Sequence, residues 1–438
     1  MKTGLTRQFF HYTIPTILSM VAFSLYTLVD GIFVAKGVGE IALAAVNLSS
    51  PYNSFLFAIA LLLAVGMSTT IAIYLGHGEE ENASELFTRN LVVAAVVSGI
   101  ITVFTMLNLE KLSVFLGANN DTLQYVKEYV SGVAPFAVFL IVSYNMEILV
   151  KTDGTPILST IGVILAGVTN LVLDWLFVII FNWGVRGAAV ATGLAQVVST
   201  VLYLLYFSRD SKKLHVVPIS FALEKLKIYR KTIPLGLADS ITEMSNGVVL
   251  FSFNQTILKL IGENGIVSYT VIGYVNTLVL MIMSGIGQGI QPISSFYYGK
   301  GERKSYETIF KMALIMAICF GCGSFLICRI FGNGIVGFFI RKDSMIYIDS
   351  VIRLRKYSVA FLLMGLNVIT AAFFTSIEKP MFSFPISIGR GLMFPIFAVA
   401  VVPYLVGKEN LWYTSAVSEG MAMVLTVFFV TRYLKWKG

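Results

Sequence analysis

The sequence predicts an all-α integral membrane protein with about twelve transmembrane helices in two pseudo-symmetric lobes of six helices each. Composition carries the first half of this prediction: 56% of the 438 residues are hydrophobic and only 13% are charged, whereas soluble domains carry about 25% charged residues. At roughly 20 apolar residues per span, the chain has room for about twelve helices and for no sizeable soluble domain. Short motifs that recur along the chain carry the second half.

Long apolar runs, separated by charged, glycine or proline residues, mark the expected helices of the first half. The first run follows the first charged residues directly and shows no small-residue cleavage site, so no cleaved signal peptide is expected. These helices lie near residues 12–35, 48–76, 88–109, 129–150, 157–181 and 186–208.

A basic connector divides the chain. Seven Lys and Arg residues lie between Arg209 and Lys231, in the longest polar interval of the sequence. The apolar runs then resume near residues 231–260, 266–297, 309–331, 354–376, 381–405 and 411–434. We therefore expect a first lobe over residues 1–208, a linker over 209–230 and a second lobe over 231–438.

The two halves carry the same landmarks at corresponding positions. The pairs are residues 74–79 (YLGHGE) with 297–302 (YYGKGE), 155–156 with 379–380, 14–15 with 233–234, and Gly193 with Gly420. The shift between partners stays between 219 and 227 positions, which predicts a duplicated six-helix unit. Duplication of this kind is typical of transporters whose substrate path lies between two rocking lobes. The Gly-x-Gly elements do not follow a strand, so we expect tight turns at helix ends and no phosphate site.

Basic residues predict the orientation in the membrane. In a twelve-helix arrangement, the face that carries both termini collects more Lys and Arg than the opposite face, so both termini are expected to be cytoplasmic in the plasma membrane. One segment argues against this orientation, because its basic residues would lie outside: Arg341, Lys342, Arg353, Arg355 and Lys356. Residues 340–356 are better interpreted as an amphipathic surface segment.

Two acids of the first half lie inside apolar runs. Asp30 is in the first expected helix, and Asp174 follows Asn170 by one helical turn in the fifth, so that Asn170 and Asp174 share one helix face. Placing a carboxylate inside a membrane costs roughly 3 kcal/mol or more, and acids in such places are functional by default. The corresponding positions of the second half are all apolar: Val249, Phe394 and Ala398. The polar set is therefore confined to the first lobe.

The motifs together resemble the multidrug and toxic compound extrusion (MATE) family, in particular its MepA-like bacterial branch. The segments that carry the resemblance span the chain: LVDGIFV (28–34), ALAAVN (42–47), YLGHG (74–78), NLVLD (170–174), and GQGIQP (287–292) followed by YG (298–299). The resemblance implies a MATE-type fold and a secondary antiporter that exports amphipathic, often cationic organic compounds in exchange for H⁺ or Na⁺. It implies no cofactor besides the coupling ion, no nucleic acid partner, and a monomer in the lipid bilayer.

The resemblance also implies an ion-coupling site made of Asp30, Asn170, Asp174 and Thr192, which would be the metal ligands if Na⁺ is the ion. Their oxygen atoms are of the type that hard cations accept, and two acids in a low dielectric favour protonation of one of them. Other interpretations stay open. Asp30 could lie in water at a helix end, Asn170 could only join helices, and Thr192 could bond the carbonyl four residues before it.

Candidates for a substrate cavity lie mostly in the second half. Glu243, in the seventh expected helix, could meet a cationic substrate or carry coupling, or it could pair with Arg390 or an Asn of its own lobe. Gln288, Gln291 and Glu419 are weaker candidates of the same kind, and Asn47 and Tyr26 are the remaining candidates.

Other functions fit the sequence less well. A flippase for lipids or lipid-linked oligosaccharides, from the same broad superfamily, would favour a strongly cationic cavity, whereas the intramembrane charges here are mostly acids, with Arg390 the main exception. A symmetric channel does not explain acids in one lobe alone. The sequence has no nucleotide-binding motif and no nucleophile with a His partner, so no enzyme is expected. Cys319 and Cys322 form a CxxC without a second pair, which favours packing over metal binding.

Overall fold

The computed structural model describes residues 2–219 and 223–435, and these are almost entirely helical. Residues 220–222 of the expected linker and the two chain ends lie outside the described residues. Within the described part, eleven helices are long and apolar enough to cross a membrane. The seventh expected helix, α10 (Tyr229–Leu260), also forms. Polar side chains such as Asp239 and Glu243 lower its hydropathy, which explains why it is absent from those eleven.

The first lobe contains the expected six spans, with two of them interrupted. Its elements are α1 (Lys2–Gly37), α2 (Glu40–His77), α3 (Glu80–Leu107), α4 (Leu109–Phe115), α5 (Leu123–Val133), α6 (Ala137–Thr152), α7 (Pro156–Asp174) and α8 (Gly184–Arg209). A 3₁₀ turn at Ala134–Phe136 joins α5 to α6, where Pro135 cannot supply a backbone donor. A π-helical turn at Trp175–Ile180 extends α7.

The second lobe repeats this pattern. The short helix α9 (Leu223–Leu226) precedes it, and its elements are α10, α11 (Glu263–Gly299), α12 (Arg303–Phe339), α13 (Tyr347–Tyr357), α14 (Phe361–Ser376), α15 (Pro380–Ile388), α16 (Phe394–Val406) and α17 (Thr414–Lys435). A 3₁₀ turn joins α13 to α14, and a π-helical turn at Gly389–Met393 joins α15 to α16. The segment expected to lie on the surface is partly α13, which buries Val351 and Leu354 and exposes Ile348.

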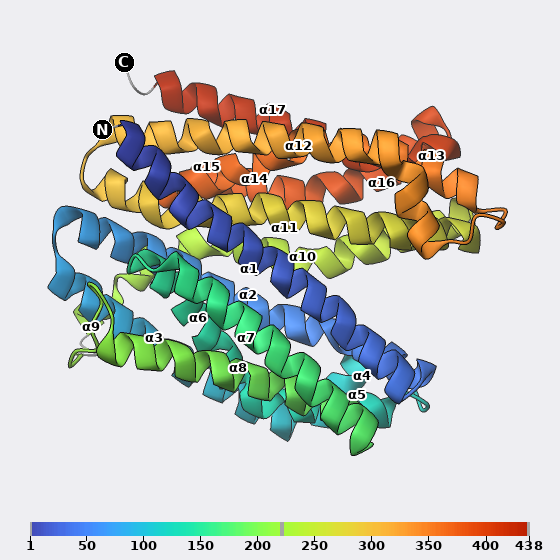
Figure 1. Cartoon of the computed structure of the whole chain (residues 1–438), viewed down its shortest axis with the longest axis horizontal. Helices are drawn as coiled ribbons and strands as arrows, with labels where there is room; N and C mark the ends of the chain where they lie inside the picture. The colour runs from blue at the N-terminus through green and yellow to red at the C-terminus, as the bar shows by residue number, and fades with distance from the viewer. Residues whose placement is uncertain (1, 220–222, 436–438) are drawn as a thin grey trace.

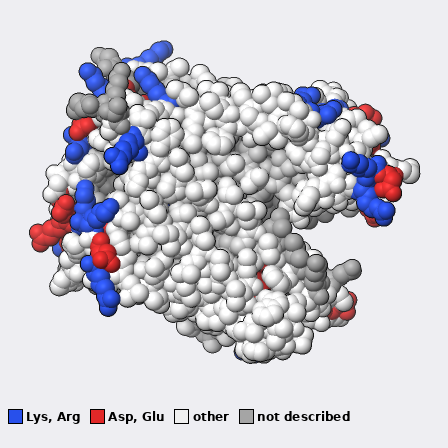
Figure 2. All heavy atoms as spheres, in the orientation of Figure 1, with Lys and Arg blue, Asp and Glu red and all other residues white. Residues whose placement is uncertain are grey.

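The helices form two bundles, each around its own apolar core (Figure 1). Helix α1 runs diagonally across both, and its residues Phe9 and Tyr12 belong to the core of the second bundle. Both termini lie on the same side, which we call the terminal face. Figure 2 shows charged side chains gathered at the two ends with an uncharged belt between them, as expected for a membrane protein. The same view shows a cleft between the lobes that opens away from the terminal face.

Glycines close the lobe interface toward the terminal face, and they do so symmetrically. A Cβ on Gly66 of α2 would lie 2.0 Å from the Thr232 carbonyl oxygen of α10, and a Cβ on Gly289 of α11 would lie 2.8 Å from Thr13 Cα of α1. The internal repeat relates these two contacts to each other, since Gly66 corresponds to Gly289 and Thr13 to Thr232. The close contacts of Gly76 with Phe296 and of Gly299 with Ile73 form a second symmetric pair. The lobes therefore touch backbone to backbone on this side.

The repeated Gly-x-Gly elements also form the tight turns expected from the sequence. Gly78 and Gly301, which end α2 and follow α11, have φ values of +83° and +71°. Residues other than glycine rarely adopt this left-handed backbone conformation. Each turn reverses the chain at the terminal face, which returns the next helix into the bundle.

Candidate functional site

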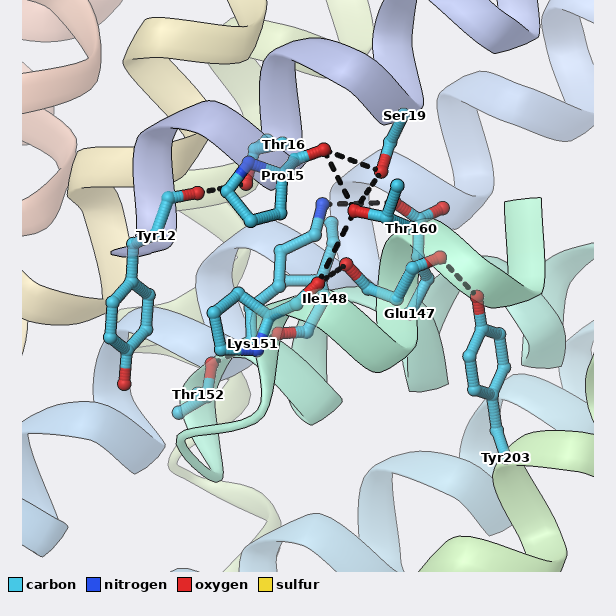
Figure 3. Close-up of polar contacts among 12 residues, drawn as sticks. Tyr12, Pro15, Thr16, Ser19, Glu147, Ile148, Lys151, Thr152, Thr160 and Tyr203 are labelled. Carbon is cyan, nitrogen blue, oxygen red and sulfur yellow. Dashed lines mark hydrogen bonds and ion pairs between the residues drawn. The ribbon is translucent and has the colours of Figure 1, made fainter. Parts of the chain in front are cut away.

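Three helices of the first lobe bring the polar residues of the expected ion site together. Asp30 lies in α1, well inside the helix and not at its end, Asn170 and Asp174 lie in α7, and Thr192 lies in α8. Helix α1 is fixed against α7 by hydroxyl groups: Ser19 Oγ donates to Thr160 Oγ1 (3.0 Å). Thr160 Oγ1 in turn donates to the Pro15 carbonyl (2.8 Å), as Figure 3 shows.

The two acids and the amide are neighbours. Asp30 lies within interaction range of both Asp174 and Asn170. Asp174 and Asn170 are 0% and 1% exposed, so water does not cover them. Asn170 Nδ2 donates a long hydrogen bond to Thr192 Oγ1 (3.4 Å), while Thr192 Oγ1 donates to the Ala188 carbonyl (3.1 Å). Thr192 thus bonds the carbonyl four residues before it and also faces the cluster.

Several oxygen atoms of this cluster are buried without a hydrogen-bond partner in the described part of the chain. They are Oδ1 of Asp30, Oδ1 of Asn170 and both carboxylate oxygens of Asp174. Buried acceptors normally have a partner, and the exceptions require an explanation. Two carboxylates this close cannot both stay ionised in a buried place unless a cation neutralises them. A proton shared by the acids or a hard cation held by their oxygens would supply the missing partner.

Two further residues complete the surroundings of the cluster. Tyr129 of α5 is 4% exposed and lies within electrostatic range of Asp30 and Asp174. Its hydroxyl accepts a hydrogen bond from Asn53 Nδ2 of α2 (3.1 Å). Neither residue is flagged by any spacing in the sequence, because Tyr129 approaches the acids, and Asn53 contacts Tyr129, only through the packing of the helices. Tyr26, one helical turn before Asp30, also lies beside it.

A second acidic group lies on α10 at the interface with the first lobe. Glu243 Oε1 accepts a hydrogen bond from Ser54 Oγ of α2 (3.4 Å), and Oε2 accepts one from Asn246 Nδ2 (3.3 Å). Asp239 lies one turn earlier on the same helix face. Within the described residues, neither acid has an ion-pair partner. The sequence analysis did not identify Asp239 as a candidate. Its i, i+4 spacing to Glu243 is the same kind of signal that identified Asn170 and Asp174.

The pairing of Glu243 with Arg390 that the sequence left open does not occur. Arg390 Nε lies 2.9 Å from Glu419 Oε1, deep in the second lobe. Glu419 is therefore neutralised within its own lobe. Of the two pairings considered for Glu243, the structure has the one with an asparagine.

The remaining cavity candidates lie in different surroundings. Gln288 of α11 lies beside the hydroxyl of Tyr144 of α6, and this tyrosine is also within electrostatic range of Asp239 and Glu243. Gln288 Oε1 is buried without a hydrogen-bond partner among the described residues. Gln291 is 5% exposed, so it packs within the protein. Asn47 is exposed near the start of α2, and in the described part of the chain it makes no hydrogen bond to either acidic group.

Known proteins resemble this chain over most of its length. A family model described as MatE matches residues 15–176 and 241–399. The multidrug export protein MepA of Staphylococcus saprophyticus is 20% identical over 428 residues, which cover 97% of this chain and 92% of that protein. MepA of Staphylococcus aureus is 23% identical over 377 residues, which cover 84% and 80%.

Solved structures share the whole fold. An outward-facing multidrug resistance MATE family transporter of the MOP superfamily aligns with a TM-score of 0.91 at 23% identity, over 99% of this chain and 97% of that one. A MATE in the straight conformation aligns with a TM-score of 0.92 at 22% identity and the same coverage. A MOP superfamily transporter from Pyrococcus furiosus, described as having a binding pocket of reverse polarity, aligns with a TM-score of 0.90 at 23% identity, over 99% and 97%.

Proposed function

Because the chain belongs to the MATE family of multidrug efflux transporters, we propose that it exports amphipathic organic cations in exchange for H⁺ or Na⁺. It is a multi-pass transporter of the cell membrane and not an enzyme, and proteins of this family use ion gradients without a cofactor. The proposal adds the class of substrate, the exchange with an ion, and a monomer whose termini both lie in the cytoplasm.

The buried cluster of Asp30, Asn170, Asp174 and Thr192 carries the proposal. Four of its oxygens have no hydrogen-bond partner among the described residues, in a place where an unpaired carboxylate is costly. An exchangeable cation relieves this cost, so loading and release of the ion change the free energy of the first lobe. Such a change is what couples an ion gradient to a movement of the lobes.

The acids of α10 support a cationic substrate. Asp239 and Glu243 lie at the lobe interface without ion-pair partners in the described residues, beside Ser54 and Tyr144 of the first lobe. An organic cation that enters the cleft would gain the attraction of two acids, and its apolar parts would pack on aromatic side chains. Gln288, which lies beside Tyr144, would adjust the fit.

The closed terminal face supports alternating access. The symmetric glycine contacts close one side of the lobe interface, while the cleft is open on the other side (Figure 2). With cytoplasmic termini, this arrangement corresponds to a state open to the outside. Separation of the glycine contacts would open the path to the cytoplasm and close the outer cleft, as in other transporters built from repeats.

The flippase alternative finds little support. A lipid pyrophosphate requires free cationic side chains, and Arg390, the main intramembrane cation, is already paired with Glu419 at 2.9 Å. The unpaired charges described at the interface are the acids Asp239 and Glu243, which would repel a pyrophosphate.

The test is efflux of ethidium from proteoliposomes under separately imposed pH and Na⁺ gradients. We expect the unchanged protein to export ethidium only when one gradient is present, and the effective gradient identifies the ion. Asp30→Asn and Asp174→Asn should each abolish this export. Asp121→Asn, which removes an exposed acid of the same lobe, is the matched control and should transport normally. Transport that survives both buried substitutions would refute the proposed ion site.

A further inference from the structure

A buried ion pair in the first lobe has no part in the sites described above. Lys151 Nζ lies 2.9 Å from Oε1 of Glu147, one helical turn earlier in α6, and the two side chains are only 2% and 8% exposed. Figure 3 shows both side chains pointing toward one another. Burial strips both charges of their water, so a pair of this kind is weak evidence for stability. The presence of this pair therefore calls for a functional explanation.

A small cavity adjoins this ion pair. Its volume is about 30 Å³, and both Glu147 and Tyr26 line it. Its other polar lining comes from Ser143, Tyr144, Gln196, Ser199 and Tyr203. A water molecule requires roughly 10–15 Å³ of such space and two to four polar partners. The cavity therefore has room and partners for water between Glu147 and helix α1.

Tyr26 connects the cavity with the proposed ion site. It precedes Asp30 by one turn of α1, and it lies within electrostatic range of both Asp30 and Glu147. Tyr203 also lies within electrostatic range of Glu147, but its hydroxyl is fixed by donation to the Ser159 carbonyl (3.0 Å). Tyr26 thus lies within electrostatic range of both acids and lines the cavity together with Glu147.

The groups that face Glu147 come from three helices. They are Lys151 of its own helix, Tyr26 of α1, Tyr203 of α8, and Tyr144 of α6, which in turn faces Asp239 and Glu243 of α10. Lys151 is the ion-pair partner of Glu147. Glu147 accordingly shares one tyrosine neighbour with Asp30 and another with the acids of the lobe interface.

We propose that Glu147 is a proton-transfer residue that receives the coupling proton from Asp30 and passes it toward the terminal face, with Lys151 as its counter-ion. This inference rests on the proposed antiport and assigns H⁺ as the ion. The O–H bond of protonated Asp30 breaks, and a new O–H bond forms at a carboxylate oxygen of Glu147. Tyr26 and cavity water each accept one proton and release one, so they are unchanged afterwards. The negative charge moves from Glu147 to Asp30, which is then ready for the next proton.

The transfer also changes the ion pair. Protonated Glu147 no longer holds Lys151 by charge, and Lys151 lies one residue before the end of α6. That end of α6 belongs to the terminal face, where the lobes separate in the proposed cycle. The proton would therefore leave Glu147 once this face opens, and the restored pair would close the cycle.

The test uses the double variant Glu147→Gln/Lys151→Met, because Glu147→Gln alone would leave Lys151 buried without its partner. Proteoliposomes that contain a pH-sensitive dye report the proton flux when ethidium is added. We expect the double variant to bind ethidium with a Kd within about two-fold of the unchanged protein and to lose at least about ten-fold in proton flux. The single variant Glu147→Asp, which keeps a carboxylate beside Lys151, should retain part of the flux. The surface ion pair of Glu110 and Lys127 (3.2 Å) provides the matched control, Glu110→Gln/Lys127→Met, which should leave the flux unchanged.

A double variant with the normal proton flux and the normal pH profile would overturn the inference and leave the pair with a structural role. Transport by the unchanged protein under a Na⁺ gradient alone would also overturn it, while the proposed antiport would still hold. No response to either gradient would refute the proposed function itself. The three results are distinct, so each identifies which proposal fails.

Discussion

Each lobe contains a buried polar cluster, and the two clusters share one pair of repeat partners, but only the second-lobe cluster contains its own cation. The internal repeat places Glu419 of α17 where the first lobe has Thr192. Arg390 Nε lies 2.9 Å from Glu419 Oε1, and Asn367 Nδ2 donates to Glu419 Oε2 at 2.7 Å. Thr426 Oγ1 donates to the amide oxygen of Asn367 at 2.8 Å. The carboxylate of this cluster has a charged partner and a hydrogen bond.

The first-lobe cluster is the opposite case. It contains two acids and no basic residue, and four of its buried oxygen atoms have no hydrogen-bond partner in the described part of the chain. A cluster that contains its counter-ion is complete at all stages of a transport cycle. A cluster that lacks a counter-ion must bind a cation from the surrounding solution. The difference indicates that the second-lobe cluster holds helices together, whereas the first-lobe cluster is available to an exchangeable ion.

The largest effect is expected from Arg390→Met. This change leaves Glu419 buried without its counter-ion, which should lower the free energy of unfolding by about 3–5 kcal/mol. The double variant Arg390→Met/Glu419→Gln should regain most of this loss, because no buried charge remains. Thermal unfolding in detergent, followed by tryptophan fluorescence, measures both. Asp174→Asn is the matched change in the first lobe and should alter stability by less than about 1 kcal/mol, since it removes a repulsion. An equal loss from both changes would contradict the contrast between the lobes.

A smaller effect should separate the two buried asparagines. Asn367 Nδ2 donates to both the carbonyl and the carboxylate of Glu419 (3.0 and 2.7 Å), so Asn367→Ala should cost about 1.5–3 kcal/mol of stability. Asn170 makes one long bond of 3.4 Å to Thr192, and its amide oxygen has no hydrogen-bond partner within the described residues. Asn170→Ala should therefore cost less than about 1 kcal/mol, while the ethidium efflux that depends on the gradient falls. Unfolding and efflux measured on the same preparations check this pair. A large loss of stability from Asn170→Ala would assign Asn170 a structural role.

Much of this contrast was accessible from the sequence, because isolated charges in apolar runs are easy to see. Asp30 and Asp174 are conspicuous for their cost, and Asn170 for its spacing. The twelve helices and the repeat followed from composition and recurring motifs. What the sequence could not supply are contacts between distant segments. Tyr129 reaches the acids only because α5 packs against α2, and the partner of Arg390 depends on how α17 meets the π-helical turn.

The lobe interface differs from both clusters, because its contacts follow the internal repeat and those of the clusters do not. Gly66 and Gly289 are partners in the repeat, and each meets the backbone of the opposite lobe at the terminal face. Space for a Cβ is therefore missing at both positions in this conformation. A conformation in which the terminal face is open would provide that space. Alanine at either position should thus act on the equilibrium between the two conformations and not on the binding sites.

The smallest expected effect follows from this symmetry. Gly66→Ala should disfavour the closed terminal face by about 1–3 kcal/mol, and Gly289→Ala should act in the same direction but less, because its contact of 2.8 Å is looser than that of 2.0 Å. Spin labels at Glu81 and Lys304, which are exposed repeat partners at the terminal ends of α3 and α12, report the distance between the lobes. Cys319, Cys322 and Cys328 must first be replaced by serine. Both alanine variants should increase the population with the longer distance. Gly99→Ala, where a Cβ would meet nothing within 4 Å, is the control. A shift from Gly66→Ala with none from Gly289→Ala would mean that one half of the interface carries the closure, and the duplicated contacts would then not be equivalent.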